Sequence, residues 1–251
     1  MTSTGDGHDK DDDLVGRHKD NVIPLKIPRK KKSVWGGDKK PNTPPPQKNN
    51  TEPFINIPPY TKFILLVMIG IHLVMTYILP EEQAHWIFIH LGFIPGRFTG
   101  NALFEPLALI TPFTYIFIHG SWLHIAMNGV MLLAFGAGVE KWMGGKKMIA
   151  FFILCSLFGV LTHFALNYNS YQPVVGASGG LSGLFAAALV MLNRRHAGMT
   201  GRYGFLPLIA VWVGVTIIFG MMGTPDGGDI AWAAHIGGFL GGFLVLKWMK
   251  L

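Results

Sequence analysis

The sequence predicts an all-α polytopic membrane protein with six transmembrane helices. Half of the 251 residues are hydrophobic and only 14% are charged. Soluble domains of this size rarely have so few charges, because they need a charged surface. The apolar residues also gather in stretches that approach the ~20 residues a helix needs to cross a ~30 Å hydrocarbon core. We therefore expect the chain to be integral to a membrane.

Six apolar stretches follow one another along the chain. They are predicted to run over residues 62–78, 122–143, 148–167, 176–192, 203–222 and 230–248. The segment between the first two, residues 79–121, is interrupted by Pro80, Pro95, Pro106 and Pro112. Because proline breaks a continuous helix, we expect this segment to be a structured outer loop and not a seventh span.

The first 59 residues have a different composition from the rest. They are rich in Lys, Asp, Asn and Pro and include the basic cluster Arg29, Lys30, Lys31 and Lys32. Such a segment buries too little apolar surface to offset the entropy of ordering it, so we expect a disordered tail. The basic cluster acts either as a topology signal or as an attraction to anionic lipids. Residues 60–251 are predicted to form one membrane-embedded domain.

Basic residues predict the orientation, because cytoplasmic flanks retain Lys and Arg. With the tail in the cytoplasm, the outer connections contain only Arg97, and both termini are cytoplasmic. The inner connections and the C-terminus contain Lys141, Lys146, Lys147, Arg194, Arg195, Arg202, Lys247 and Lys250. This asymmetry accounts for the formal charge of +7 without a nucleic acid partner. The single cysteine, Cys155, lies in an apolar run and excludes an intramolecular disulfide or a cysteine-based metal site. We expect no metal and no cofactor.

Four polar side chains lie near the outer ends of the even-numbered spans. His124 and Asn128 are in the second span, Ser178 opens the fourth, and His235 is in the sixth. Polar groups inside a span are costly, so they indicate either function or an internal contact. Three separate helices are thus predicted to place polar groups at one depth.

These four residues match the needs of nucleophilic catalysis. A serine needs a base, and His235 on another helix at matching depth is the candidate for Ser178. His124 and Asn128 are four residues apart on one helical face, and the Ser178 N–H lies at a positive helix end, so all three are candidate oxyanion donors.

No carboxylate is expected to complete a triad. Asp229 is six residues before His235, which places it ~9 Å away along the helix and on another face. It is expected to cap that helix. Glu140 is twelve residues after Asn128, or ~18 Å deeper, out of reach of the pair.

Glycines are expected to let the fourth and sixth spans approach closely. Gly176 and Gly179 flank the candidate nucleophile, and Gly183 follows on the same helix. Gly238 and Gly242 follow His235 by three and seven residues. Small faces let helix backbones pack tightly, which a contact between Ser178 and His235 requires.

At these residues the sequence resembles the rhomboid protease family over roughly residues 60–250. The motifs that carry the resemblance are His124-x-x-x-Asn128, Gly176-Ala177-Ser178-Gly179, Ala234-His235-Ile236-Gly237-Gly238-x-x-x-Gly242 and Gly138-Val139-Glu140-Lys141. The resemblance implies a rhomboid-like six-helix bundle and a Ser178/His235 dyad that is open to the outer side and gated by the fifth span. It also implies a structural role for Glu140, single-span membrane proteins as substrates, and cleavage in or near their transmembrane segment. The compact six-span core suggests a prokaryotic inner membrane.

Two positions depart from the family pattern. Ser182 stands where many members have an aromatic residue that supports the imidazole, and the outer loop has Arg97 without the common Trp-Arg pair. Two other kinds of function remain open. One is a non-catalytic membrane protein of the same fold that binds substrate spans, and the other is a transporter in which His124 and His235 relay protons. The transporter would need acidic residues at mid-membrane, and the sequence has none there.

Overall fold

The computed structural model describes residues 56–195, 203–222 and 231–251. The tail expected at residues 1–59 therefore lies almost entirely outside the described residues. The described part belongs to one unit, Glu52–Leu251. It is helical throughout, apart from connections and an isolated antiparallel bridge between Phe93 and Val174.

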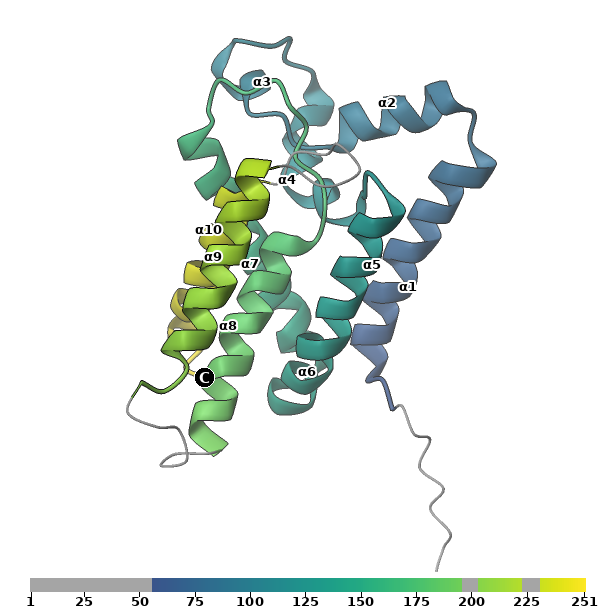
Figure 1. Cartoon of the computed structure of the whole chain (residues 1–251). Coiled ribbons are helices and arrows are strands. Elements are labelled where there is room, and N and C mark those ends of the chain that lie inside the picture. Colours follow the sequence, from purple (N-terminus) through teal and green to yellow (C-terminus); the bar gives the residue numbers. More distant parts are fainter. Residues whose placement is uncertain (1–55, 196–202, 223–230) are drawn as a thin grey trace, which may run out of the picture. The chain divides into compact units, whose positions relative to one another are not determined.

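The helical elements follow the predicted spans closely (Figure 1). α1 (Pro59–Leu73) continues into a π-helical turn, η1 (Val74–Ile78). α5 (Trp122–Met131), the π-helical turn η4 (Leu132–Gly136) and α6 (Ala137–Met143) form one continuous helix. α7 (Gly145–Leu166), α8 (Ser178–Arg195), α9 (Leu206–Met222) and α10 (Trp232–Trp248) complete the set.

Three of these helices are long and apolar enough to cross a membrane, among the residues that the structure describes. They are Pro59–Ile78, Trp122–Met143 and Gly145–Leu166. α8 has 18 residues and α9 and α10 have 17 each. The all-α fold is confirmed, and the count of six spans stays a prediction that is compatible with these lengths.

Residues 79–121 contain short helices. These are α2 (Glu81–Leu91), α3 (Gly96–Thr99), η2 (Pro106–Ile110), α4 (Thr111–Thr114) and η3 (Tyr115–Phe117). Prolines lie at or just before the start of several of them, where the missing N–H costs nothing. The segment is therefore folded, and its prolines set the helix starts.

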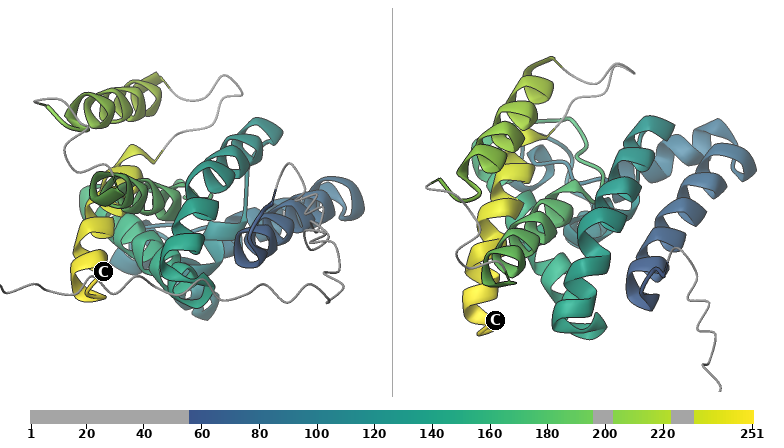
Figure 2. Two further views of the ribbon diagram at one scale, coloured as in Figure 1. Left: turned by 90° about the horizontal axis from the view of Figure 1, so that it is seen from below. Right: turned by 60° about the horizontal axis from the view of Figure 1, so that its bottom comes forward.

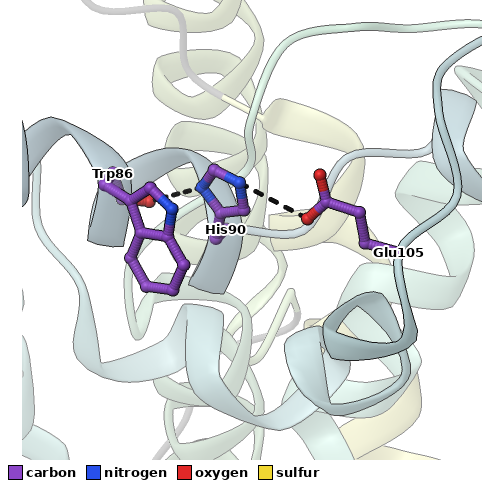
Figure 3. Close-up of polar contacts among 3 residues, drawn as sticks. All are labelled: Trp86, His90 and Glu105. Atoms are coloured by element: carbon purple, nitrogen blue, oxygen red, sulfur yellow. Dashed lines mark hydrogen bonds and ion pairs between the residues drawn. The ribbon is translucent and has the colours of Figure 1, made fainter.

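One ion pair joins the end of α2 to the residue before η2 (Figure 3). His90 Nε2 lies 3.3 Å from Glu105 Oε2, and His90 Nδ1 lies 2.9 Å from the carbonyl oxygen of Trp86, whose ring stacks on the imidazole. Both side chains are partly exposed, at 21% and 34%. Such a pair contributes at most about 1 kcal/mol, so it fixes the loop only weakly.

α7, α8 and α10 pack against one another, with α10 beside both of the others in Figure 1. Glycines make this approach possible. A Cβ added at Gly238 of α10 would lie 1.9 Å from the carbonyl oxygen of Gly179 in α8. A Cβ added at Gly159 of α7 would lie 2.7 Å from the carbonyl oxygen of Ala234. The three backbones are thus in direct contact at one level, with no room for a side chain.

α1 is held to α6 by a buried carboxylate. Glu140 Oε2 accepts hydrogen bonds from the N–H and the hydroxyl of Thr61, both at 2.7 Å. Its Oε1 accepts a third from the N–H of Tyr60 at 3.1 Å. These N–H groups belong to the first turn of α1, where no intrahelical acceptor exists. Glu140 is only 6% exposed, so it caps α1 from inside the protein.

α9 contacts its neighbours through aromatic rings. Trp212 lies 4.7 Å from Phe239 of α10 and 5.6 Å from Phe185 of α8, measured between ring centroids. Both views in Figure 2 show α9 at the edge of the bundle, away from α1 and α5. Ile209 and Trp212 of α9, with Phe205 just before it, pack against the cluster that contains Phe185 and Phe239.

We expect Glu140→Ala to lower the free energy of unfolding by at least about 2 kcal/mol, because it leaves two backbone N–H groups near α1 without their acceptor. Thermal unfolding in detergent micelles measures this change. Lys141→Ala is the control, because Lys141 is the exposed neighbour on the same helix. Equal unfolding temperatures for the two variants would contradict the capping role.

We expect Gly238→Ala to destabilise the protein by about 2 kcal/mol or more, because the new methyl group forces α8 and α10 apart. The matched control is Gly138→Ala, whose Cβ would meet only the flexible end of Met191 at 3.5 Å. Alanine is otherwise the better helix former, so Gly138→Ala should be neutral or stabilising. An unfolding temperature for Gly238→Ala at or above that of the wild type would show that the close contact is unimportant.

Candidate active site

Ser178 and His235 are in direct contact. Ser178 Oγ lies 2.7 Å from His235 Nε2, a hydrogen-bond distance, between the first residue of α8 and the first turn of α10. For the hydroxyl to donate to Nε2, the imidazole must carry its proton on Nδ1. The two side chains, which the sequence predicted to lie at one depth, are therefore hydrogen-bonded to each other, and both are partly buried.

The backbone around Ser178 is set by a glycine and by Tyr115 at the start of η3. Gly176 has φ +108°, a conformation that L side chains rarely adopt. Its N–H donates to the carbonyl oxygen of Tyr115 at 2.9 Å, and the Tyr115 hydroxyl donates to the carbonyl oxygen of Ser156 at 2.7 Å. Tyr115 thus ties the turn before Ser178 to α7.

His124 lies against this same turn. A Cβ added at Gly176 would be 2.5 Å from His124 Nε2, so only glycine leaves room for the imidazole. The ring comes from the first turn of α5, where the Ser121 hydroxyl caps the helix by accepting from the His124 N–H at 3.2 Å. The structure therefore brings His124 to the turn that leads into Ser178.

Asn128 lies one helical turn further along α5 and is buried, at 3% exposed. Its Nδ2 donates to the carbonyl oxygen of His124 at 2.8 Å. Its Oδ1 is also buried and has no hydrogen-bond partner among the described residues. One hydrogen on Nδ2 remains for another acceptor, because the amide carries two donors.

A third histidine packs against His124. The rings of His119 and His124 are 5.1 Å apart in an edge-to-face arrangement, and His119 is only 3% exposed. Burial, and secondarily the neighbouring His124, lower the pKa of His119 to about 3. The His119 ring is therefore neutral, and it packs against the His124 ring without adding a positive charge.

The structure shows no described carboxylate at the Ser178/His235 pair. Glu140 bonds to Tyr60 and Thr61 at the start of α1. Asp229, expected to cap the last helix, lies outside the described residues. Ser182, at the position where many family members have an aromatic residue, donates its hydroxyl to the carbonyl oxygen of Ser178 at 2.8 Å. It therefore bonds to the nucleophile's own backbone and provides no ring for His235.

The glycines singled out from the sequence lie where α8 meets its neighbours. Gly179 faces Ala234 and Gly159, and Gly238 faces Gly179. A Cβ on Gly183 would meet Cys155 of α7 at 2.4 Å, and one on Gly242 would meet Ala186 of α8 at 2.9 Å. Sequence reasoning missed the contribution of α7, although Gly159 within an apolar run was a usable signal.

Arg97 lies in α3 and makes no hydrogen bond to Ser178 or His235 among the described residues. Arg97 is 7% exposed in α3, and its Nη1 has no hydrogen-bond partner among the described residues. No group of three or more His, Cys, Asp or Glu side chains in the described ranges is arranged to hold a metal ion. The described site brings together a hydroxyl, a candidate base and donors at a helix start, which are the groups that acyl transfer uses.

Comparison with known proteins agrees with this geometry. The Rhomboid domain family model matches residues 107–250, more than half of the chain. RHOMBOID-like protein 5 of Arabidopsis thaliana is 28% identical over 130 residues, which are 52% of this chain and 40% of that protein. Rhomboid protease GluP of Bacillus subtilis is 29% identical over 135 residues, 54% of this chain and 24% of that protein.

Rhomboid protease GlpG of Haemophilus influenzae is 24% identical over 131 residues, 52% of this chain and 65% of that protein. The chain thus spans less than two thirds of the length of each of these three relatives. The matched region contains Ser178, His235, His124 and Asn128. A family-model match over more than half of the chain makes it a member of the rhomboid family, the family of the intramembrane serine proteases, and an integral membrane protein.

Proposed function

We propose that this protein is an active intramembrane serine endopeptidase that cleaves single-span membrane proteins in or near their transmembrane segment. The observation that carries the proposal is the 2.7 Å contact between Ser178 Oγ and His235 Nε2 at the start of α8. Rhomboid relatives named as proteases support the same reaction class. Because the family also includes inactive members, the contact matters more than the family name.

In the proposed mechanism, Ser178 Oγ attacks the scissile carbonyl carbon while His235 Nε2 takes the hydroxyl proton. The carbonyl oxygen becomes an oxyanion, which the Ser178 N–H, His124 and Asn128 stabilise as donors. Collapse expels the amine, which receives the proton from His235 and leaves an acyl-enzyme on Ser178. A water molecule then loses a proton to His235 and attacks the ester carbonyl carbon. Collapse breaks the bond to Ser178 Oγ, which takes the proton back from His235, and releases the new carboxyl group.

The proposal includes a topology. Residues 60–251 form the protease domain, and residues 1–59 form its cytoplasmic tail. Both termini lie in the cytoplasm of a prokaryotic cell, and the site opens to the outer side of its inner membrane. The end of α6, the start of α7 and the end of α8 support this orientation. Lys141, Lys146, Arg194 and Arg195 lie there, at the end of the bundle away from Ser178.

We expect Ser178→Ala and His235→Ala each to reduce cleavage of a model single-span substrate in proteoliposomes by at least about 10³-fold, because the pair acts as one unit. The same variants should lose labelling by a serine-directed phosphonate. His85→Ala, an exposed histidine on α2, is the control that should keep both. A folded wild type that neither cleaves nor takes up the phosphonate would instead support a non-catalytic protein that binds substrate spans.

We expect His124→Ala and Asn128→Ala to lower the cleavage rate by roughly 10²-fold to 10³-fold, the usual cost of one oxyanion donor. Met127→Ala is the matched control, because Met127 lies between them on α5 and is 57% exposed. Single-turnover cleavage at saturating substrate separates this effect from binding. A rise in KM with an unchanged turnover rate would assign these two residues to substrate binding and remove them from the oxyanion site.

A further inference from the structure

A second feature of the fold is a groove of about 420 Å³ between α1, α2 and the segment that leads to α5. Its walls include Gly70 and Ile71 of α1, Ile87 and Leu91 of α2, and Phe117 and Ile118. It is partly open and lies apart from Ser178 and His235. Nothing in the mechanism uses it.

The groove offers no partner to water. Its lining is almost wholly apolar, and the one side-chain hydroxyl, that of Thr114, already donates to the carbonyl oxygen of Leu91 at 2.7 Å. A buried water needs two or more polar partners, so water does not fill such a space. An empty groove would leave its walls without dispersion contacts on one side. An apolar occupant is therefore favoured.

The groove is continuous with a surface that faces lipid. α1 and η1 together are long and apolar enough to span the bilayer. Val74 lines the groove and is 40% exposed, and the neighbouring Tyr77 and Ile78 are 70% and 71% exposed. In an integral membrane protein such side chains contact hydrocarbon. The material outside the mouth of the groove is thus the lipid acyl region.

The size of the groove selects the kind of occupant. A single turn of helix, roughly 10 Å wide and 5.4 Å long, takes up roughly 420 Å³, so a helix that crosses the membrane does not fit inside. A hydrocarbon chain is narrower and flexible enough to enter. We propose that one acyl chain of a membrane lipid occupies this groove as a bound component of the folded protein.

The position of the groove links the lipid to the rest of the fold. Ile118 forms part of its wall and is 2% exposed, and the next residue is His119, which packs on His124. A bound acyl chain would support the segment that leads from Ile118 to His119, on the side opposite to the histidine rings. This inference requires only that the protein is integral to a membrane, which its membership of the rhomboid family shows. It does not require protease activity.

The test uses phosphatidylcholine with a diazirine in the middle of one acyl chain, in nanodiscs that contain the full chain. After irradiation, mass spectrometry locates the lipid adducts. We expect adducts on residues 114–118, because Thr114, Phe117 and Ile118 line the groove. Adducts on Phe63 and Leu66, which are 61% and 56% exposed on α1, report contact with bulk lipid.

Two variants fill the groove from opposite walls. Gly70→Phe is favourable for this purpose, because a Cβ at Gly70 has nothing within 4 Å, and Ile87→Trp provides a second case if the first folds poorly. Each should cause loss of the adducts on residues 114–118 and leave those on Phe63 unchanged. Leu66→Phe, on the same helix outside the groove, should leave the adducts on residues 114–118 unchanged.

Two results would overturn the proposal. One is a folded wild type with abundant adducts on Phe63 and Leu66 and none on residues 114–118. The other is labelling of residues 114–118 that persists in both groove-filling variants, which would mean that the chain reaches this segment by another path. Because no cleavage is measured, failure here would leave the proposed protease function untouched.

Discussion

The contact between the backbones of Gly179 and Gly238 is the constraint on which the rest of the site depends. Ser178 Oγ and His235 Nε2 lie on different helices, so their 2.7 Å contact depends on how those helices pack. A Cβ at Gly238 would lie 1.9 Å from the Gly179 carbonyl oxygen, so the approach is at its limit. Helices in a bilayer gain little from hydrophobic burial, so this close packing also provides cohesion for the bundle.

Packing is also close on the N-terminal side of Ser178. Gly176 takes a positive φ and leaves its Cβ position to the His124 ring, while its N–H is held by the Tyr115 carbonyl oxygen. The candidate oxyanion donors are thus positioned by backbone contacts and not by long, flexible side chains. Such groups change little in conformation during a reaction, which is the condition for strong electrostatic stabilisation.

The sequence was sufficient to predict the all-α architecture and the helices that carry Ser178, His235, His124 and Asn128, because apolar runs and isolated polar residues are strong signals in a membrane span. It did not indicate that α7 forms one wall of the site through Gly159 and Ser156, since its pattern is apolar on all sides. Nor did it indicate the hydrogen bond of Ser182 or the groove beside α1. These features depend on distances between distant segments, which periodicity does not encode.

Among the described residues, neither a carboxylate nor a ring at position 182 orients His235, the proposed base. Ser182 instead bonds to the Ser178 carbonyl, so it acts on the backbone of the nucleophile. The orientation of the imidazole then depends mainly on the placement of α10. On this helix, Ala234 next to His235 packs against Gly159 of α7, and Gly238 packs against Gly179 of α8. Aligning a base through helix packing makes its reactivity sensitive to small helix movements.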